Sequence, residues 1–202
     1  FERRVDKTWQ QFFVKGINLG LAIPGYYPGE YPIGKLQYKR WFEQMTAAGF
    51  NTVRVYTIQS PSFYEALAAV NESGRSLYLI QGVWIEPPKD DNFSSDAFLR
   101  YTRGQITDAV NIIFGNINLP ERPGCPHGSY TCDISHLVLG LIFGREWEGC
   151  PLRNYNRLKG NIRSSFNGTF LSITDATPFE LWICNTLEEF LAYEEKSYGV
   201  TH

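Results

Sequence analysis

The chain carries a glutamate directly behind its most apolar stretch, where a carboxyl group could transfer protons. Residues 137–143 form an almost purely apolar run, and the segment 144–148 that follows it reads GREWE. Such a run predicts a strand buried on both faces, as in a parallel sheet covered by helices. Parallel α/β proteins keep their reactive residues at the carboxyl ends of such strands. Glu146 is therefore the first candidate for a general acid or base.

Two tryptophans and a second carboxylate stand at similar positions. Trp84 and Glu86 lie at the end of another predicted strand, and Trp147 directly follows Glu146. Indole rings stack on planar groups and sugar faces, but each tryptophan could equally pack under a loop. Glu86 is a rival acid, although the two prolines after it favour a shaped loop.

Hydrophobic periodicity divides the chain into alternating strands and helices. Apolar side chains at helical spacing, with capping residues or glycine at the ends, predict each helix. The last helix opens with a capping box formed by Thr177 and Glu180, with Pro178 at its first position. The segments 115–133 and 149–176 have no clear period, and we expect an ordered excursion and a long loop. The predicted strands are residues 11–20, 51–57, 76–85 and 137–143, and the predicted helices are residues 38–48, 60–74, 95–114 and 177–199.

This order of four strand–helix units predicts an α/β protein with a parallel sheet and right-handed crossovers. Four units make either an open sheet or half of an eight-unit barrel, which normally needs about 250 residues. Val200 and Thr201 look like the first residues of a fifth strand, and the chain begins at Phe1 rather than Met. We therefore expect one domain over residues 1–202 that forms half of a barrel in a longer protein.

Composition argues against two classes of partner. The net charge of the 202 residues is -2, and no basic run suggests a nucleic-acid surface. No apolar run approaches the roughly 18 residues that a membrane-spanning helix needs, so we expect no membrane partner. Glycosylation sequons at Asn71, Asn92 and Asn167 weakly favour the secretory pathway or the extracellular space.

The cysteines give no metal signal. Three of the 4 cysteines, Cys125, Cys132 and Cys150, flank the apolar run, but they form no CxxC pair. A disulfide among the three and free thiols are both compatible with this spacing. We expect neither a metal nor a cofactor.

The succession FFVKGINLG, AGFNTVRVYT, ESGRSLYLIQGVW and VLGLIFGREWE resembles the N-terminal half of the retaining glycoside hydrolase clan. That clan consists of TIM barrels of the cellulase, β-galactosidase and β-1,3-glucanosyltransferase type. The resemblance covers about residues 11–148, and AGFNTVRVYT is its most specific part. It implies a partial (β/α)8 TIM barrel of about four βα units with a long loop after strand four, and a carbohydrate substrate.

The resemblance also implies roles for single residues. The acid/base glutamate of the clan ends strand four and maps onto Glu146, and an arginine beneath the catalytic carboxylates maps onto Arg54. Arg54 would then face a barrel interior, where an unpaired charge is costly, so we expect a carboxylate partner for it. A proton-shuttling carboxyl group needs a raised pKa, which an apolar wall provides, and Trp147 is the candidate wall. The residues expected to contact sugar are Asn18, Tyr56, Trp84, Glu86 and Trp147.

Retaining glycosidases need a second carboxylate about 5 to 5.5 Å from the first. By resemblance this nucleophile comes from strand seven, so the missing C-terminal half is an expected partner and the isolated chain is expected to be inactive. The clan places asparagine before the acid/base, where this chain has Arg145. Because of Arg145, a carbohydrate-binding barrel without catalysis remains an alternative to a hydrolase. A transglycosylase remains a second alternative, because the choice between water and a second sugar as acceptor depends on water exclusion in the closed site.

Overall fold

The computed structural model describes residues 2–5 and 8–202. The chain divides into two compact units, and the prediction of a single domain over residues 1–202 stays a prediction. Unit 1 comprises Phe1–Gly82 and Ile112–Ile142, and unit 2 comprises Val83–Asn111 and Phe143–His202.

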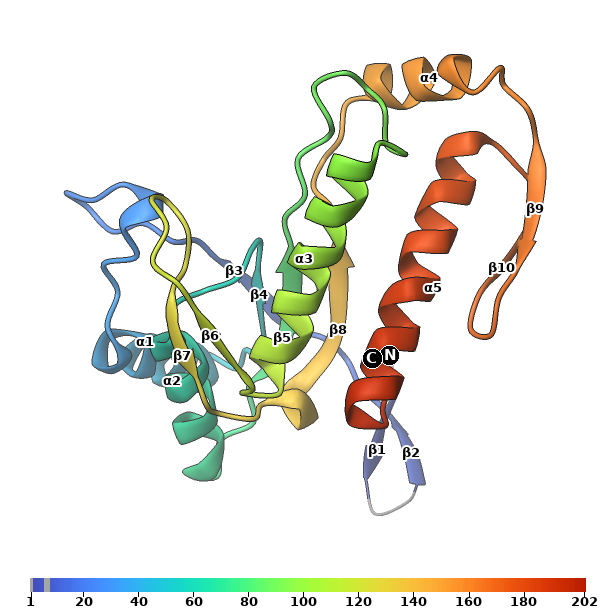
Figure 1. Cartoon of the computed structure of the whole chain (residues 1–202). Coiled ribbons are helices and arrows are strands. Elements are labelled where there is room, and N and C mark those ends of the chain that lie inside the picture. The colour runs from blue at the N-terminus through green and yellow to red at the C-terminus, as the bar shows by residue number, and fades with distance from the viewer. Residues whose placement is uncertain (1, 6–7) are drawn as a thin grey trace. The chain divides into compact units, whose positions relative to one another are not determined.

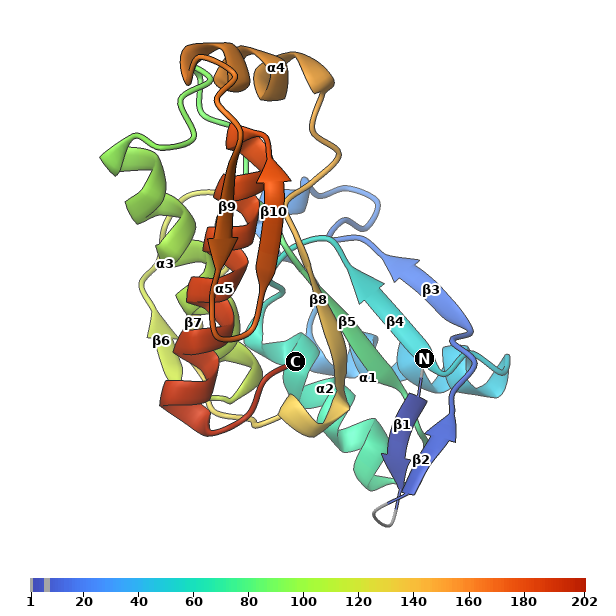
Figure 2. The ribbon, with the colours of Figure 1, turned by 90° about the vertical axis from the view of Figure 1, so that its right-hand side faces the viewer.

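A four-stranded parallel sheet forms the centre of unit 1, with its strands in the order β3-β4-β5-β8 (Figures 1 and 2). All four lie within or overlap predicted strands, which confirms the α/β class and the parallel sheet. In the part of the chain that the structure describes, the sheet does not close into a barrel. The strands are β3 (Gly16–Leu19), β4 (Thr52–Val55), β5 (Tyr78–Val83) and β8 (Val138–Phe143).

The two faces of this sheet differ in burial. Helices α1 (Lys35–Ala47) and α2 (Pro61–Glu72) lie together behind the sheet in Figure 2. Val53 and Val55 of β4 are fully buried, whereas Arg54 between them is only half-buried. Because side chains alternate along a strand, Arg54 lies on the opposite face from the two valines.

Unit 1 also contains short elements that the sequence pattern did not predict. An antiparallel pair precedes the sheet, and a second antiparallel pair lies inside the excursion predicted for residues 115–133. The two pairs are β1 (Glu2–Val5) with β2 (Thr8–Gln11), and β6 (Ile117–Leu119) with β7 (Gly128–Tyr130); the 3-10 turns are η1 (Pro28–Glu30) and η2 (Ser135–Leu137).

Unit 2 combines helices with one antiparallel hairpin. Helix α3 ends in unit 1 with Ile112 and Ile113, and the hairpin pairs β9 with β10. An aromatic cluster supplies much of its core, with Phe93 at 5.0 Å from both Phe179 and Trp182 between ring centroids. The elements are α3 (Asp96–Ile113), α4 (Gly149–Leu158), β9 (Ser164–Asn167), β10 (Ser172–Ala176) and α5 (Pro178–Tyr198).

Two predictions about the C-terminal residues 149–201 are wrong. The segment 149–176 is not a long loop without structure, because it holds α4, β9 and β10. Val200 and Thr201 form no strand in the structure. The four predicted helices are confirmed as α1, α2, α3 and α5, with ends that differ from the predicted ones by a few residues.

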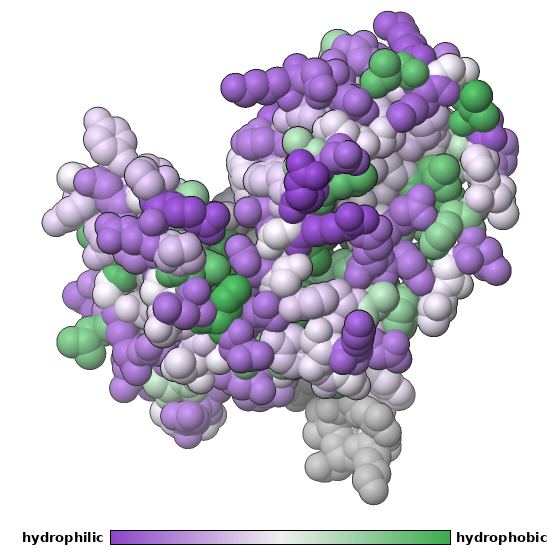
Figure 3. All heavy atoms as spheres, viewed as in Figure 1, coloured by the Kyte–Doolittle hydropathy of each residue, from purple (hydrophilic) through white to green (hydrophobic). Residues whose placement is uncertain are grey.

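The surface is largely polar on the face drawn in Figure 3, where apolar residues form small separate groups. Over the described residues, no helix combines the length and apolar character required to cross a bilayer.

Candidate functional site

The residues predicted to form a site divide between the two units. Trp84, Glu86, Glu146 and Trp147 belong to unit 2, and Asn18, Arg54 and Tyr56 belong to unit 1. The structure brings Trp84 and Glu86 together in unit 2, and it brings Arg54 and Tyr56 together in unit 1.

In unit 1, the three predicted residues lie on the neighbouring strands β3 and β4 or directly after β4. Asn18 of β3 and Arg54 of β4 are partners in the strand register, and the side chain of Asn18 is exposed. The guanidinium carbon of Arg54 lies 4.5 Å from the ring centroid of Tyr56. Tyr56 is 39% exposed, so this cation and ring form a surface that a ligand can reach.

Arg54 lacks the carboxylate partner that the sequence predicted. Among the described residues no acidic side chain pairs with it, and its buried Nε atom has no hydrogen-bond partner. A buried N–H group without a partner costs about 1 to 3 kcal/mol. None of the described residues therefore supplies the carboxylate partner that was predicted for Arg54.

In unit 2, the chain turns sharply where β8 ends. Gly144 adopts a positive φ of 84°, and its backbone N–H donates to the carbonyl of Val83 at 2.9 Å. A Cβ atom on Gly144 would lie 2.9 Å from the indole of Trp147, so glycine makes room for this ring. The Nε1–H of Trp147 donates to the carbonyl of Ile85 at 2.8 Å, which ties the segment after β8 to the segment after β5.

The ring of Trp147 lies in the aromatic cluster of unit 2. Its centroid is 5.7 Å from Phe179, 5.9 Å from Phe93 and 5.9 Å from Trp182. These contacts favour the packing interpretation of Trp147 over sugar stacking. They also direct the ring into the core, so Trp147 does not provide the apolar wall expected beside Glu146.

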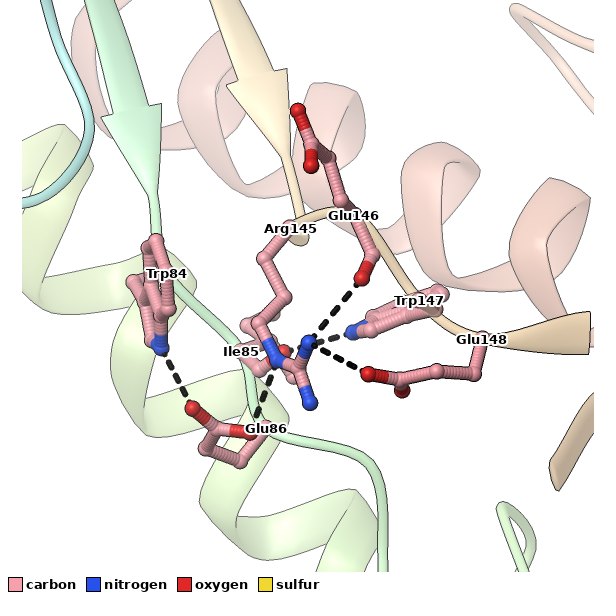
Figure 4. A network of polar contacts seen from close by, with 7 residues as sticks. All are labelled: Trp84, Ile85, Glu86, Arg145, Glu146, Trp147 and Glu148. Carbon is pink, nitrogen blue, oxygen red and sulfur yellow. Dashed lines mark hydrogen bonds and ion pairs between the residues drawn. The ribbon is translucent and has the colours of Figure 1, made fainter.

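We define the strand-end cluster as Trp84, Glu86, Arg145, Glu146 and Glu148 (Figure 4). The guanidinium of Arg145 contacts three groups within this cluster. Its Nε atom lies 2.8 Å from Oε2 of Glu86, and its Nη1 atom donates to the backbone carbonyl of Glu146 at 2.9 Å. The same Nη1 atom lies 3.5 Å from Oε1 of Glu148. The hydrogen bond with Glu86 raises the pKa of Arg145, so its guanidinium stays positively charged.

Glu86 uses both carboxylate oxygens within this cluster. Oε1 accepts a 2.8 Å hydrogen bond from Nε1 of Trp84, and Oε2 accepts the one from Arg145. A carboxylate held in this way positions its neighbours and is a poor proton shuttle. Trp84 remains 38% exposed, so its orientated ring can serve as a stacking platform.

Glu146 differs from its acidic neighbours. Its side chain is exposed, and Figure 4 shows the carboxylate directed away from the guanidinium of Arg145. No hydrogen bond or ion pair engages that carboxylate in the described chain. By contrast, Glu148 has a lowered pKa, first through a hydrogen bond from its own backbone N–H and then through Arg145. The prediction that Trp147 forms an apolar wall beside Glu146 is wrong, because the ring of Trp147 packs in the aromatic cluster and Glu146 is exposed.

Sequence reasoning did not assign Arg145 and Glu148 to the site. The signal that could have found Arg145 is a cation followed by two acidic residues, Glu146 and Glu148, at the end of an apolar strand. Its partner Glu86 lies 59 residues away, beyond the reach of local patterns.

No cluster of three or more His, Cys, Asp or Glu suited to a metal ion occurs among the residues that the structure describes. No family model, curated protein or solved structure matches the chain.

Proposed function

We propose that this chain is part of a glycoside-acting enzyme of the retaining type, with Glu146 as its general acid/base. The observation that carries the proposal is the contrast between a free carboxylate and a fixed backbone. Arg145 holds the carbonyl of Glu146, Gly144 donates its backbone N–H to the carbonyl of Val83, and Trp147 donates its indole N–H to the carbonyl of Ile85. The carboxylate of Glu146 itself stays exposed and unpaired among the described residues.

The chemistry asked of Glu146 is a proton transfer in each of two steps. As an acid it protonates the oxygen of the leaving sugar while a second carboxylate attacks the anomeric carbon. As a base it then takes a proton from the water that hydrolyses the glycosyl-enzyme intermediate. If a second sugar replaces this water, the same groups perform transglycosylation.

The remaining residues have supporting roles in this proposal. The second carboxylate comes from a C-terminal half, and the unpaired guanidinium of Arg54 offers an electrostatic partner for a carboxylate. The exposed ring of Trp84 provides a stacking surface for a sugar, and Glu86 holds that ring in place. Asn18 and Tyr56 supply a hydrogen-bonding group and a ring beside Arg54.

The proposal places these residues on a partial (β/α)8 barrel of about four units. The strands of the sheet follow one another in chain order, and two crossover helices lie on the same face, as in such a barrel. Its outer strands would then be β3 and β8, each with one open edge. A chain that stays monomeric at high concentration in size-exclusion chromatography would contradict the half barrel, because open edges promote association.

A second candidate is a barrel that binds carbohydrate without cleaving it. Two observations favour it: Arg145 occupies the place of the clan's asparagine and is engaged by Glu86, and Arg54 has no carboxylate partner in the described chain.

The deciding experiment compares wild type with Glu146→Gln in the complete reading frame, on aryl glycosides and β-glucans. Loss of the general acid should lower turnover by about 10²- to 10⁴-fold. Glu195→Gln removes an exposed carboxylate from α5 and is the matched control. Equal rates for wild type and Glu146→Gln would remove Glu146 from the mechanism. Absence of turnover in both, with β-glucan binding retained, would select the non-catalytic barrel.

A further inference from the structure

Unit 2 contains a cavity of about 500 Å³ that none of the predicted site residues lines. Its walls come from α3 and Ser94 before it, from α4, β9 and the chain between them, and from α5, and all the lining residues belong to unit 2. The volume falls within the range of small-molecule sites, about 300 to 1,000 Å³.

Two polar groups in the cavity wall have no hydrogen-bond partner. Thr102 of α3 is 1% exposed and Trp182 of α5 is 5% exposed, and both residues line the cavity. Their Oγ1 and Nε1 atoms are buried without a partner, and within the described part of unit 2 they are the two side-chain atoms in this state. Buried polar groups are almost always paired, so two exceptions on one cavity indicate a site for a missing partner.

Comparable tryptophan and threonine side chains of unit 2 have hydrogen-bond partners. Trp84 and Trp147 each donate their Nε1–H at 2.8 Å, to a carboxylate and to a carbonyl. The hydroxyls of Thr107 and Thr186 each donate to the carbonyl four residues earlier, at 2.7 and 2.8 Å. Thr102 also stands in a helix, where the same bond is open to it, yet its hydroxyl does not form it.

The other walls define the chemistry of a ligand. Tyr155 and Trp182 provide aromatic surface, and Leu99 and Leu181 provide aliphatic surface. Arg103 and Glu189 line the cavity as a pair, with two contacts of 2.7 and 2.8 Å that neutralise their charges. The exposed Lys159, near the ring of Tyr155, has no ion pair among the described residues and leaves the cavity wall with one positive charge.

We propose that this cavity binds a small planar aromatic acid. The rings of Tyr155 and Trp182 pack against its aromatic part, and Lys159 attracts its carboxylate. A carboxylate oxygen accepts from Trp182 Nε1 and from the hydroxyl of Thr102, the two buried groups of the lining residues that have no partner. This site does not depend on the proposed glycosidase function.

The test uses 1-naphthoate as the probe and the full chain as the protein. The indole N–H signals of the 5 tryptophans are followed by NMR during titration, and Trp182→Phe assigns the signal of Trp182. We expect a saturable shift that is largest for the Trp182 N–H. The absence of a shift at millimolar probe, or equal shifts of all five signals, would overturn the proposal.

Matched variants separate a binding role from a structural one. Thr102→Val keeps the shape of the side chain and should weaken binding about tenfold, because it removes one hydrogen bond to a charged group. It should also raise the melting temperature, because a buried hydroxyl without a partner is lost. Thr107→Val lies on the same helix outside the cavity and should bind naphthoate like wild type. Equal weakening by the two variants, or a lower melting temperature for Thr102→Val, would contradict the proposal.

A charge variant tests the acidic part of the ligand. Lys159→Gln should weaken naphthoate about fivefold and leave the neutral 1-naphthalenemethanol unchanged, because an exposed ion pair contributes about 1 kcal/mol or less. Equal effects on both probes would contradict the choice of an acid. Binding of cellotriose in place of naphthoate, with the same shift of Trp182, would show a sugar subsite and overturn the proposal.

Discussion

Arg145 and Glu86 form an ion pair at 2.8 Å that connects the segment after β8 with the segment after β5. The side chain of Arg145 is 20% exposed, which is low for an arginine at the end of a strand. Because its other nitrogen holds the carbonyl of Glu146, this pair fixes the backbone from which the free carboxylate projects. The arginine that departs from the clan's pattern is therefore a structural clamp for the proposed acid/base.

Replacing Arg145 with glutamine should loosen the segment 144–148. The variant loses the ion pair with Glu86 and the charge near Glu148, so backbone amides of this segment should exchange faster with deuterium. Hydrogen exchange measured by mass spectrometry checks this. Lys35→Gln is the control, because it breaks an exposed ion pair with Glu65 at 3.0 Å in unit 1. Unchanged exchange in the segment 144–148 would show that Arg145 does not clamp it.

Gly144→Ala should lower the free energy of unfolding by about 1 to 3 kcal/mol. The residue would hold a left-handed backbone conformation, and its Cβ would lie 2.9 Å from Trp147. Chemical denaturation measures the change. A stability equal to that of wild type would mean that the turn after β8 rearranges without cost.

Gly104→Ala, in the same unit, should stabilise the protein, whereas Gly144→Ala should destabilise it. Gly104 lies inside α3, is exposed, and has no atom within 4 Å of a built Cβ. Alanine is a better helix former, so the free energy of unfolding should rise by about 0.5 to 1 kcal/mol. The same denaturation experiment measures the decrease in stability for Gly144→Ala and the increase for Gly104→Ala. A loss of stability for Gly104→Ala would contradict the assignment of residue 104 to a helix.

Glu188 should make the β9–β10 hairpin sensitive to acid. Burial raises the pKa of this carboxyl, but hydrogen bonds from the backbone N–H groups of Thr169, Leu171 and Phe170 outweigh it, so the pKa lies below its ordinary value. The folded state then binds the proton more weakly than the unfolded state. The stabilisation is complete above the unfolded pKa of about 4.3 and is lost as pH falls through the folded pKa.

Hydrogen exchange of the amides of residues 169–171 between pH 6 and 3 measures this effect, after correction for the intrinsic exchange rate. Glu188→Gln removes the titrating group and should abolish the acid-dependent part of the protection. If wild type and variant lose protection in parallel as the pH falls, another group controls the hairpin.

The parallel sheet could be predicted because its pattern is local. Val53 and Val55 alternate with Arg54, and the structure buries the valines and leaves the arginine half-buried. The capping box of the last helix was equally readable, and Glu180 N–H does donate to Oγ1 of Thr177.

The hairpin β9–β10 and helix α4 could not be read in the same way. Helix α4 spans only 10 residues and Tyr155 is its one buried residue, so its amphipathic pattern is too short to stand out in the sequence. Most residues of the hairpin are exposed, and Glu188, about 20 residues later, caps its turn. Contacts at such separations in sequence leave no local signature.

The contacts of the strand-end cluster could not be predicted from the sequence. Parallel strands end at the same edge, so residues after β5 and β8 lie near each other, but the ion pair between Glu86 and Arg145 was not predicted. The choice of Trp147 for the core and Trp84 for the surface depends on residues far along the chain, such as Phe179. The sequence around Trp84 and around Trp147 does not indicate which of the two rings is buried and which is exposed.

The cysteines yield a prediction about reactivity. The same measurement decides whether three of them include a disulfide or are free thiols. All four, Cys125, Cys132, Cys150 and Cys184, are free thiols in the structure. Burial raises the pKa of Cys132 and of Cys184, and less thiolate at neutral pH means slower reaction. Cys150 is exposed and should react first with an aromatic disulfide reagent, and Cys184 is buried and should react last.

Stopped-flow absorbance at pH 7.5 separates these phases, and the same reagent in denaturant counts all thiols. Cys150→Ser should remove the fast phase and leave the slow phase of Cys184 unchanged. Four thiols per unfolded chain agree with the structure, whereas two would show a disulfide. A fast phase that survives in Cys150→Ser would assign it to Cys125 or Cys132, and would mean that solvent access at those half-buried positions is greater than the structure allows.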